Sequence, residues 1–256
     1  MKYIRTALII AGVAVATAAC NRKPVLPEFG MLEIDTLVGS PENGCRIEYR
    51  FATLGNAAKS PALQAIEKAN IEYFFELEDF DGTAREAADS AIRQTAADLL
   101  FPEGVGGAYE ISATAESGTT DSLVTYTISR WSFTGGAHGM YGTECHTYLL
   151  SDGQELFLAD LFTPAQLSGM EELLRKKLYE EYETDSDDGL AGQGFFPEYI
   201  GLTENFQIFP DGITFLYNPY DIGCYALGAV EVTFSNEELA GLKAENGSAA
   251  SGNGKR

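Results

Sequence analysis

Histidine is scarce in this sequence. His138 and His146 are its 2 histidines, and a glycine-containing segment separates them. Zinc hydrolases use two or three histidines at helical or clustered spacing. The sequence also has no Gly-x-Ser-x-Gly elbow and no Gly-x-x-x-x-Gly-Lys phosphate loop. We therefore expect no metal ion and no cofactor, and an enzyme is the less favoured class.

Basic residues are also few. The chain has 17 Lys and Arg against 38 Asp and Glu, which gives a net charge of −21 at pH 7. Such a surface repels nucleic-acid backbones and anionic lipid headgroups, so both are excluded as partners. It would attract a basic protein and speed its arrival. Solubility alone is the simpler account of the charge.

Long apolar runs are missing except at the N-terminus. Lys2 and Arg5 precede an apolar run that ends with Thr17-Ala18-Ala19 before Cys20. A basic start, a short apolar run and small residues before the cut are typical of a signal peptide, and a transmembrane helix needs about 20 apolar residues. The cysteine resembles the acylated residue of bacterial lipoproteins. An ordinary signal peptide cut near Ala19 is the alternative.

We predict a leader over residues 1–19, lipidation of Cys20, and an exported protein anchored to the cell envelope, at the outer membrane. The acyl chains would be its membrane anchor, because stable anchoring needs more than one chain. Removing Lys2 and Arg5 with the leader leaves 15 basic against 38 acidic residues, a net charge of −23.

Cysteine is rare, with 4 residues in the chain. Because Cys20 is assigned to lipid, at most one disulfide can form among Cys45, Cys145 and Cys224. The pair cannot be derived from sequence, although Cys145 with Cys224 is slightly favoured. No Cys-x-x-Cys pair supports a zinc knuckle or a thioredoxin-like site. Cys145 and His146 cannot form a dyad, since neighbours on a strand point to opposite faces.

The order of expected elements indicates an α+β fold. Residues 20–30 predict a tether, and alternation predicts strands at 31–38, 45–54, 108–115, 122–133, 141–150, 155–158, 206–209, 213–217 and 228–234. Capping patterns predict helices that begin after Ser60, Thr83 and Thr163, and a short last helix over 235–242. Asp160 is expected to cap the turn into the third main helix. Residues 183–194 are expected to form a loop, and residues 244–256 a disordered tail.

Six residues are weak candidates for ligand binding. They lie in the glycine-rich segment and in a tyrosine-rich segment near the C-terminus: Gly135, Gly136, His138, Tyr141, Tyr217 and Tyr220. Together with Tyr225, the tyrosines could line a surface for a sugar or a protein. The structural alternative is that the glycines allow a sharp turn, that backbone hydrogen bonds hold His138, and that the tyrosines pack on a sheet.

Three segments carry a family resemblance. They are Gly135–Gly139 (GGAHG), Asp152–Phe162 (DGQELFLADLF) and Tyr217–Gly228 (YNPYDIGCYALG). Their order and spacing resemble the extracytoplasmic domain pair of the RsiV/PdaC family, over about residues 45–242. Cys224 departs from an expected proline, and His146-Thr147 departs from a frequent asparagine. The resemblance implies two α+β lobes with mixed sheets and C-terminal hairpins: a PdaC-like lobe at 31–130 and an RsiV-like lobe at 131–243.

The resemblance implies binding more than chemistry. In RsiV this region binds lysozyme outside the membrane, and in PdaC it accompanies a separate deacetylase domain whose signatures are absent here. We expect a non-enzymatic envelope lipoprotein that binds a basic, lysozyme-like protein or peptidoglycan fragments. The alternative is an enzyme acting on cell-wall glycan through Asp or Glu pairs. A purely structural lipoprotein is the third reading.

Overall fold

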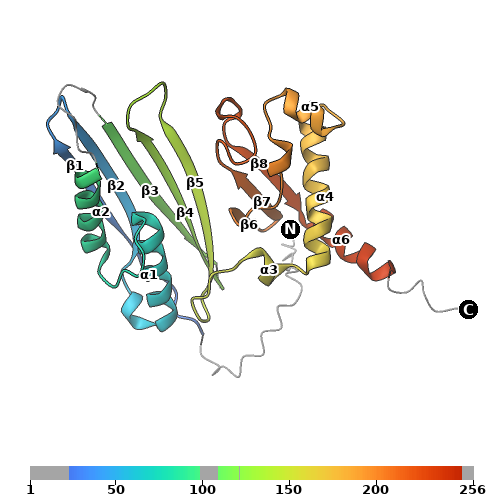
Figure 1. Cartoon of the computed structure of the whole chain (residues 1–256). Coiled ribbons are helices and arrows are strands. Elements are labelled where there is room, and N and C mark those ends of the chain that lie inside the picture. Colours follow the sequence, from blue (N-terminus) through green and yellow to red (C-terminus); the bar gives the residue numbers. More distant parts are fainter. Residues whose placement is uncertain (1–22, 99–108, 121, 250–256) are drawn as a thin grey trace, which may run out of the picture.

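The computed structural model describes residues 23–98, 109–120 and 122–249, without the side chains of 243–249. The predicted leader and Cys20 lie outside these residues. Within the described part, no helix is long and apolar enough to cross a membrane. Two sheets with helices on their faces make a mixed α+β fold, as predicted, and Figure 1 shows the sheets side by side.

The first sheet has five strands in the order β1-β2-β3-β4-β5. They are β1 (Phe29–Gly39), β2 (Gly44–Leu54), β3 (Tyr109–Thr119), β4 (Leu123–Phe133) and β5 (Met140–Leu149). Neighbours are antiparallel except β2 and β3. A parallel pair needs a crossover connection, which here contains the 3-10 helix η1 (Ala57–Lys59), α1 (Pro61–Phe75) and α2 (Ala84–Asp98).

Local signals placed both crossover helices correctly at their starts. Pro61 occupies the first turn of α1, and Thr83 with Glu86 forms the expected reciprocal cap of α2, with hydrogen bonds of 2.8 and 3.3 Å. Leu63 and Ile66 of α1 are buried, whereas Tyr73 is 38% exposed. On α2, Ala84, Ala87 and Ala88 are buried and Ile92 packs partly buried against the core, whereas Ala96 is exposed.

The core of this half lies between the helices and one face of the sheet. Cys45, Ile47, Tyr49 and Phe51 alternate along β2 and pack against apolar residues of α1. Phe74 and Phe75 contact Tyr49 and Phe51 through ring pairs 5.0–5.9 Å apart. Figure 1 shows α1 and α2 over the β1–β3 side of the sheet, so β4 and β5 extend beyond them. The sheet continues to residue 149, past the predicted lobe boundary at residues 130 and 131.

The C-terminal half contains α3 (Leu158–Leu161), α4 (Pro164–Glu181), α5 (Asp187–Gly192) and the 3-10 helices η2 (Pro197–Tyr199) and η3 (Tyr225–Leu227). Its antiparallel sheet orders β6 (Phe206–Phe209), β7 (Gly212–Tyr217) and β8 (Val230–Ser235), followed by α6 (Asn236–Ala249). Met170, Leu174 and Leu178 of α4 are fully buried and join the core formed by this sheet.

Four sequence expectations need correction. Residues 155–158 do not form a strand: Glu155 makes a single bridge to Tyr148, and α3 begins at Leu158. The Asp160 carboxylate accepts the Phe157 N–H at 3.0 Å, which caps this short helix. The expected loop at residues 183–194 contains the short helix α5. The Ser186 side chain caps the start of this helix. The last strand starts at Val230, since η3 precedes it. The last helix extends to Ala249, into the expected tail.

The three cysteines within the described residues are unpaired. Cys45, Cys145 and Cys224 are all free thiols, so the favoured Cys145–Cys224 disulfide is wrong for this structure. Cys145 is buried in β5, while the Cys224 sulfur lies against Gly194 in the other half of the molecule. The two thiols thus belong to different packing environments. Burial raises the pKa of Cys145 to about 11.

Candidate functional site

Two asparagines join the halves of the molecule at the edge strand β5. Asn205 accepts the Cys145 N–H at 2.9 Å and donates to the Thr143 carbonyl at 2.8 Å. Asn218 accepts the Thr143 N–H at 2.7 Å. Side-chain amides thereby replace the missing neighbouring strand, because unpaired backbone groups need partners. This junction brings the 134–139 loop close to the 218–228 segment.

The glycine-rich loop between β4 and β5 turns as the sequence indicates. Gly135 and Gly136 have φ angles of 94° and 101°, a region that favours glycine. His138 Nδ1 lies 2.9 Å from the Gly139 carbonyl, so the backbone contact expected for His138 is present. The ring of His138 also stacks on Tyr225 with a centroid distance of 3.8 Å. The loop therefore places an imidazole on the opposite segment.

Aromatic rings from the two segments meet in one exposed cluster. We call Trp131, His138, Tyr141, Tyr220 and Tyr225 the aromatic patch. Tyr225 lies at its centre, 5.9 Å from Tyr141 and 5.8 Å from Tyr220 between ring centroids. Trp131 is the cross-strand partner of Tyr141. Trp131, Tyr141 and Tyr220 are 37%, 39% and 49% exposed. The patch thus contains three of the six candidates, and Gly135 and Gly136 shape the loop beside it.

Tyr217 does not belong to this surface. Its side chain is 2% exposed, and its hydroxyl donates to the Gly201 carbonyl at 2.8 Å. Burial raises the pKa of this hydroxyl above its ordinary value. Tyr217 shares a face of β7 with buried Ile213 and Phe215. The alternation of residues along the strand therefore already indicated that the Tyr217 side chain faces the core. The prediction of an exposed binding tyrosine at this position is corrected. Trp131 was not predicted as a binding residue, although its cross-strand register with Tyr141 could have identified it.

A charged network occupies the helix-facing side of β4 and β5. Arg130 Nη1 lies 2.8 Å from Glu144 Oε1, its Nε lies 3.7 Å from Glu76, and the guanidinium also donates to the Tyr73 carbonyl. His146 Nδ1 is 2.7 Å from Glu155 Oε1. The His146 ring stacks on Tyr73 at 3.9 Å. These contacts connect α1, the sheet and the segment that enters the C-terminal half.

The network fixes the charges of its members. Burial alone would raise the pKa of Glu144, but the contact with His146 and the charge of Arg130 outweigh it and lower this pKa. Burial alone would lower the pKa of His146, yet Glu144 and Glu155 outweigh it and raise that pKa. A carboxylate–imidazolium pair is therefore favoured at this position. Among the described residues, no group of three or more His, Cys, Asp or Glu is placed to hold a metal ion.

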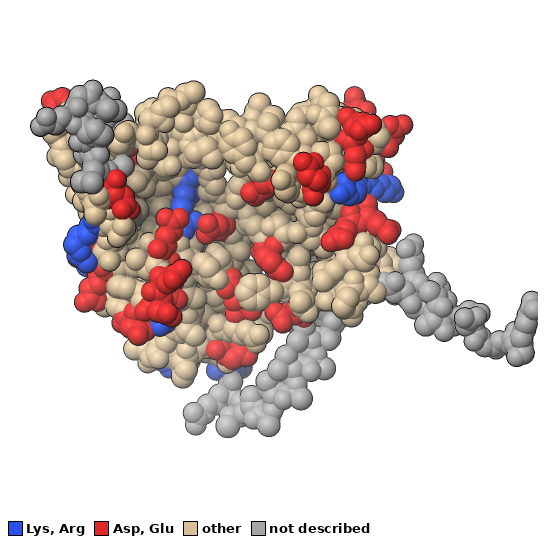
Figure 2. All heavy atoms as spheres, in the orientation of Figure 1, with Lys and Arg blue, Asp and Glu red and all other residues tan. Residues whose placement is uncertain are grey.

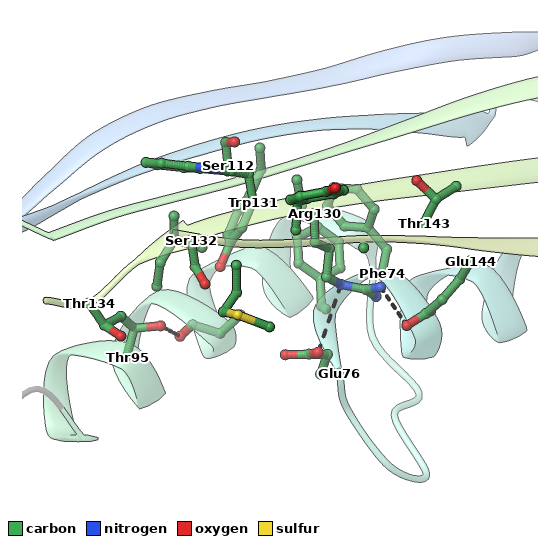
Figure 3. A pocket seen from close by; sticks show the side chains of 18 of the residues that line it. Phe74, Glu76, Thr95, Ser112, Arg130, Trp131, Ser132, Thr134, Thr143 and Glu144 are labelled. Carbon is green, nitrogen blue, oxygen red and sulfur yellow. Dashed lines mark hydrogen bonds and ion pairs between the residues drawn. The ribbon is translucent and has the colours of Figure 1, made fainter. Parts of the chain in front are cut away.

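A cavity of about 500 Å³ opens beside this network. It lies between the ends of α1 and α2 and the helix-facing side of β3, β4 and β5, as Figure 3 shows. Figure 2 shows the same face with acidic side chains in clear excess over basic ones. The molecule thus offers two features: an exposed aromatic patch, and an acidic cavity on the helix-facing side of the same strands.

Comparisons with known proteins identify a domain family and a fold. Residues 159–237 match the family described as "Protein of unknown function (DUF3298)". Comparison with curated proteins returns no match. A solved DUF3298 family structure from Bacteroides fragilis has a TM-score of 0.73 and 22% identity, and covers 86% of this chain and 94% of its own. A second from Pseudomonas aeruginosa has a TM-score of 0.63 and 20% identity, and covers 86% and 95%. These identities show a shared fold, and residues 159–237 are similar to the DUF3298 family of proteins of unknown function.

Proposed function

We propose that this protein is a non-enzymatic binding module of the cell envelope, held by lipid on Cys20, whose aromatic patch binds a basic, lysozyme-like protein. The observation that carries the proposal is the exposed aromatic patch itself. Tyrosine and tryptophan dominate the binding energy of many protein interfaces. The resemblance to the RsiV/PdaC family supports the same class of partner.

The patch is preorganised for binding. Tyr225 donates its hydroxyl to the Gly139 carbonyl at 2.8 Å, and its ring is stacked on His138. Tyr220 adopts a φ of 77°, which the adjoining turn holds through a Tyr220 N–H to Gly223 carbonyl bond of 3.1 Å. Rings that are fixed before binding lose little conformational entropy when a partner arrives.

Charge supports a basic partner. The chain carries 38 acidic and 17 basic residues, and acidic side chains spread over the face in Figure 2. A field of this sign raises the association rate of a cationic protein and sets partner choice. The aromatic patch would supply affinity, and the charge would supply steering.

Peptidoglycan fragments are the second candidate ligand. The His138 and Tyr225 rings stack on each other, inclined by 20°, and Tyr220 lies beside them. Flat aromatic faces offer apolar area together with polar edges, which suits sugar rings. An enzyme acting on cell-wall glycan is the alternative. A glycan hydrolase needs a carboxyl group with a raised pKa at its site. Burial raises the pKa of Glu67 to about 7, but this residue does not line the cavity. Glu144 lines the cavity and has a lowered pKa.

Calorimetric titration of the full chain in non-ionic detergent with lysozyme tests the proposal. Tyr141→Ala and Tyr220→Ala should each weaken binding about tenfold or more, the usual effect of removing an aromatic anchor. Tyr199→Ala is the matched control, because Tyr199 is 66% exposed and outside the patch, and its affinity should equal that of the wild type. Equal affinity of all four proteins would refute the patch as the binding surface.

Soluble muropeptides separate the second candidate from the first. Trp131 is the 1 tryptophan of the chain and belongs to the patch, so its emission reports on glycan binding. A saturable change in emission without lysozyme binding would favour the glycan. Release of shorter sugars during the titration would favour the enzyme.

A further inference from the structure

The cavity beside Arg130 has an apolar floor. Tyr49 and Phe74 come from the core between α1 and β2, and Leu77 and Ile111 add aliphatic surface. Its volume of about 500 Å³ is within the usual range of small-molecule sites, roughly 300–1,000 Å³. Helices α1 and α2 cover the β1–β3 side of the sheet (Figure 1), so they leave this cavity open. The floor therefore suits a hydrocarbon segment.

Carboxylates surround that floor. Glu76, Asp98 and Glu144 line the cavity from three different elements or their ends, and Arg130 is the one guanidinium in the described lining. Arg130 already contacts Glu144, Glu76 and the Tyr73 carbonyl. Three carboxylates against one engaged guanidinium leave the cavity with excess negative charge. The charge complements a cation.

The carboxylates lie at separated places. Figure 3 shows Thr95 of α2 on one side of the cavity, and Glu76 and Glu144 on the other. Asp98 belongs to the same end of α2 as Thr95. Ser132 and Thr134 also line the cavity, and their hydroxyls have no hydrogen-bond partner within the described residues. These groups can accept hydrogen bonds from ammonium groups.

We propose that this cavity binds an aliphatic di- or polyamine, with its hydrocarbon segment on the apolar floor and its ammonium groups at the carboxylates of α2 and of the Glu76–Glu144 side. Ammonium groups are attracted both to carboxylates and to the faces of aromatic rings. A neutral apolar ligand would leave the carboxylates without a cation. A compact metal cation would make no use of the apolar floor. Although Trp131 and Tyr141 of the aromatic patch also line this cavity, the inference does not require the basic protein proposed for the patch.

Titration of the full chain in non-ionic detergent with spermidine tests the inference. The wild type should bind one spermidine, and Glu76→Gln combined with Asp98→Asn should weaken this binding about tenfold or more, because charged hydrogen bonds are lost. Glu171→Gln combined with Glu172→Gln is the matched control. It removes the same charge from the exposed side of α4, far in sequence from the cavity, and should keep wild-type affinity. Equal weakening in both double variants would overturn the proposal, since it would show only general attraction to an acidic protein.

Competition on the wild type provides a readout that does not depend on variants. A diol with the same carbon spacing as the diamine segment should not displace spermidine, and Mg²⁺ at equal charge concentration should displace it poorly. Displacement by Mg²⁺ as effectively as by a second polyamine would reduce the site to an acidic cluster and contradict the inference. Displacement by the diol would contradict the role of the ammonium groups.

Discussion

At the scale of single residues, Glu67 is a carboxyl group that the fold holds partly buried on α1. Its Oε2 accepts the Leu54 N–H at 2.8 Å, but burial outweighs this bond and raises the pKa to about 7. The folded state therefore binds a proton more strongly than the unfolded state. Stability falls as the pH rises from the ordinary carboxyl value toward 7, where the native carboxyl ionises.

Glu67→Gln should remove this dependence, because glutamine keeps the acceptor and has no charge. We expect the variant to be more stable than the wild type at pH 8 by roughly 1–3 kcal/mol, and about equally stable below the ordinary carboxyl pKa. Urea unfolding at both pH values measures the difference. An equal change in stability at the two pH values would contradict the assigned burial.

Gly136 tests the glycine-rich turn. Its φ is 101°, and a Cβ there would meet nothing within 4 Å, so backbone strain is the main cost of substitution. Gly136→Val should lower the free energy of unfolding by more than about 1 kcal/mol. Gly201→Val is the control, because that site is equally open and has no positive φ. A similar loss in both variants, measured by urea unfolding, would remove the conformational explanation.

At the scale of elements, local sequence signals predicted most helix starts but not the joining of the two sheets. Thr163 and Gln166 form the expected reciprocal cap of α4, as Thr83 and Glu86 do for α2. These signals depend on residues three positions apart. The aromatic patch instead requires segments near residues 131–141 and 220–225 to meet, and no local pattern encodes that contact.

The edge of β5 is the contact that sequence reasoning missed. Asn205→Ala would leave the Cys145 N–H without its acceptor, whereas the Thr143 carbonyl would keep the Asn218 amide as a donor. We expect a loss of about 1–3 kcal/mol, the usual cost of one unsatisfied buried polar group. Asn236→Ala, which removes only an exposed bond to Pro210, should cost far less. Urea unfolding and hydrogen exchange at the Cys145 amide provide the measurement. Unchanged exchange in Asn205→Ala would show that the amide has another protector.

At the scale of the whole molecule, the envelope location is a proposal that rests on the leader and Cys20. Cys20→Ser should release the protein from membranes into the soluble fraction, because the acyl chains are its proposed anchor. Cell fractionation followed by detection of the chain measures this. Cys224→Ser is the control and should stay with membranes. A Cys20→Ser protein that remains membrane-bound would contradict lipid anchoring.

The acidic charge and the exposed aromatic surface together support a basic protein as the partner. Exposed rings were predicted at Tyr141 and Tyr220, and both lie in the patch. The prediction of an exposed ring at Tyr217 is wrong because this side chain lies on the buried face of β7. Electrostatic steering weakens as salt shortens the screening length to about 8 Å near physiological strength, whereas ring contacts persist. Salt therefore separates the two contributions.

Titration of the full-length protein with lysozyme at low and at high salt is the most direct test. We expect measurable binding at low salt that becomes clearly weaker at high salt, with the loss concentrated in the association rate. Absence of binding at low salt, or an affinity that ignores salt, would contradict a basic partner.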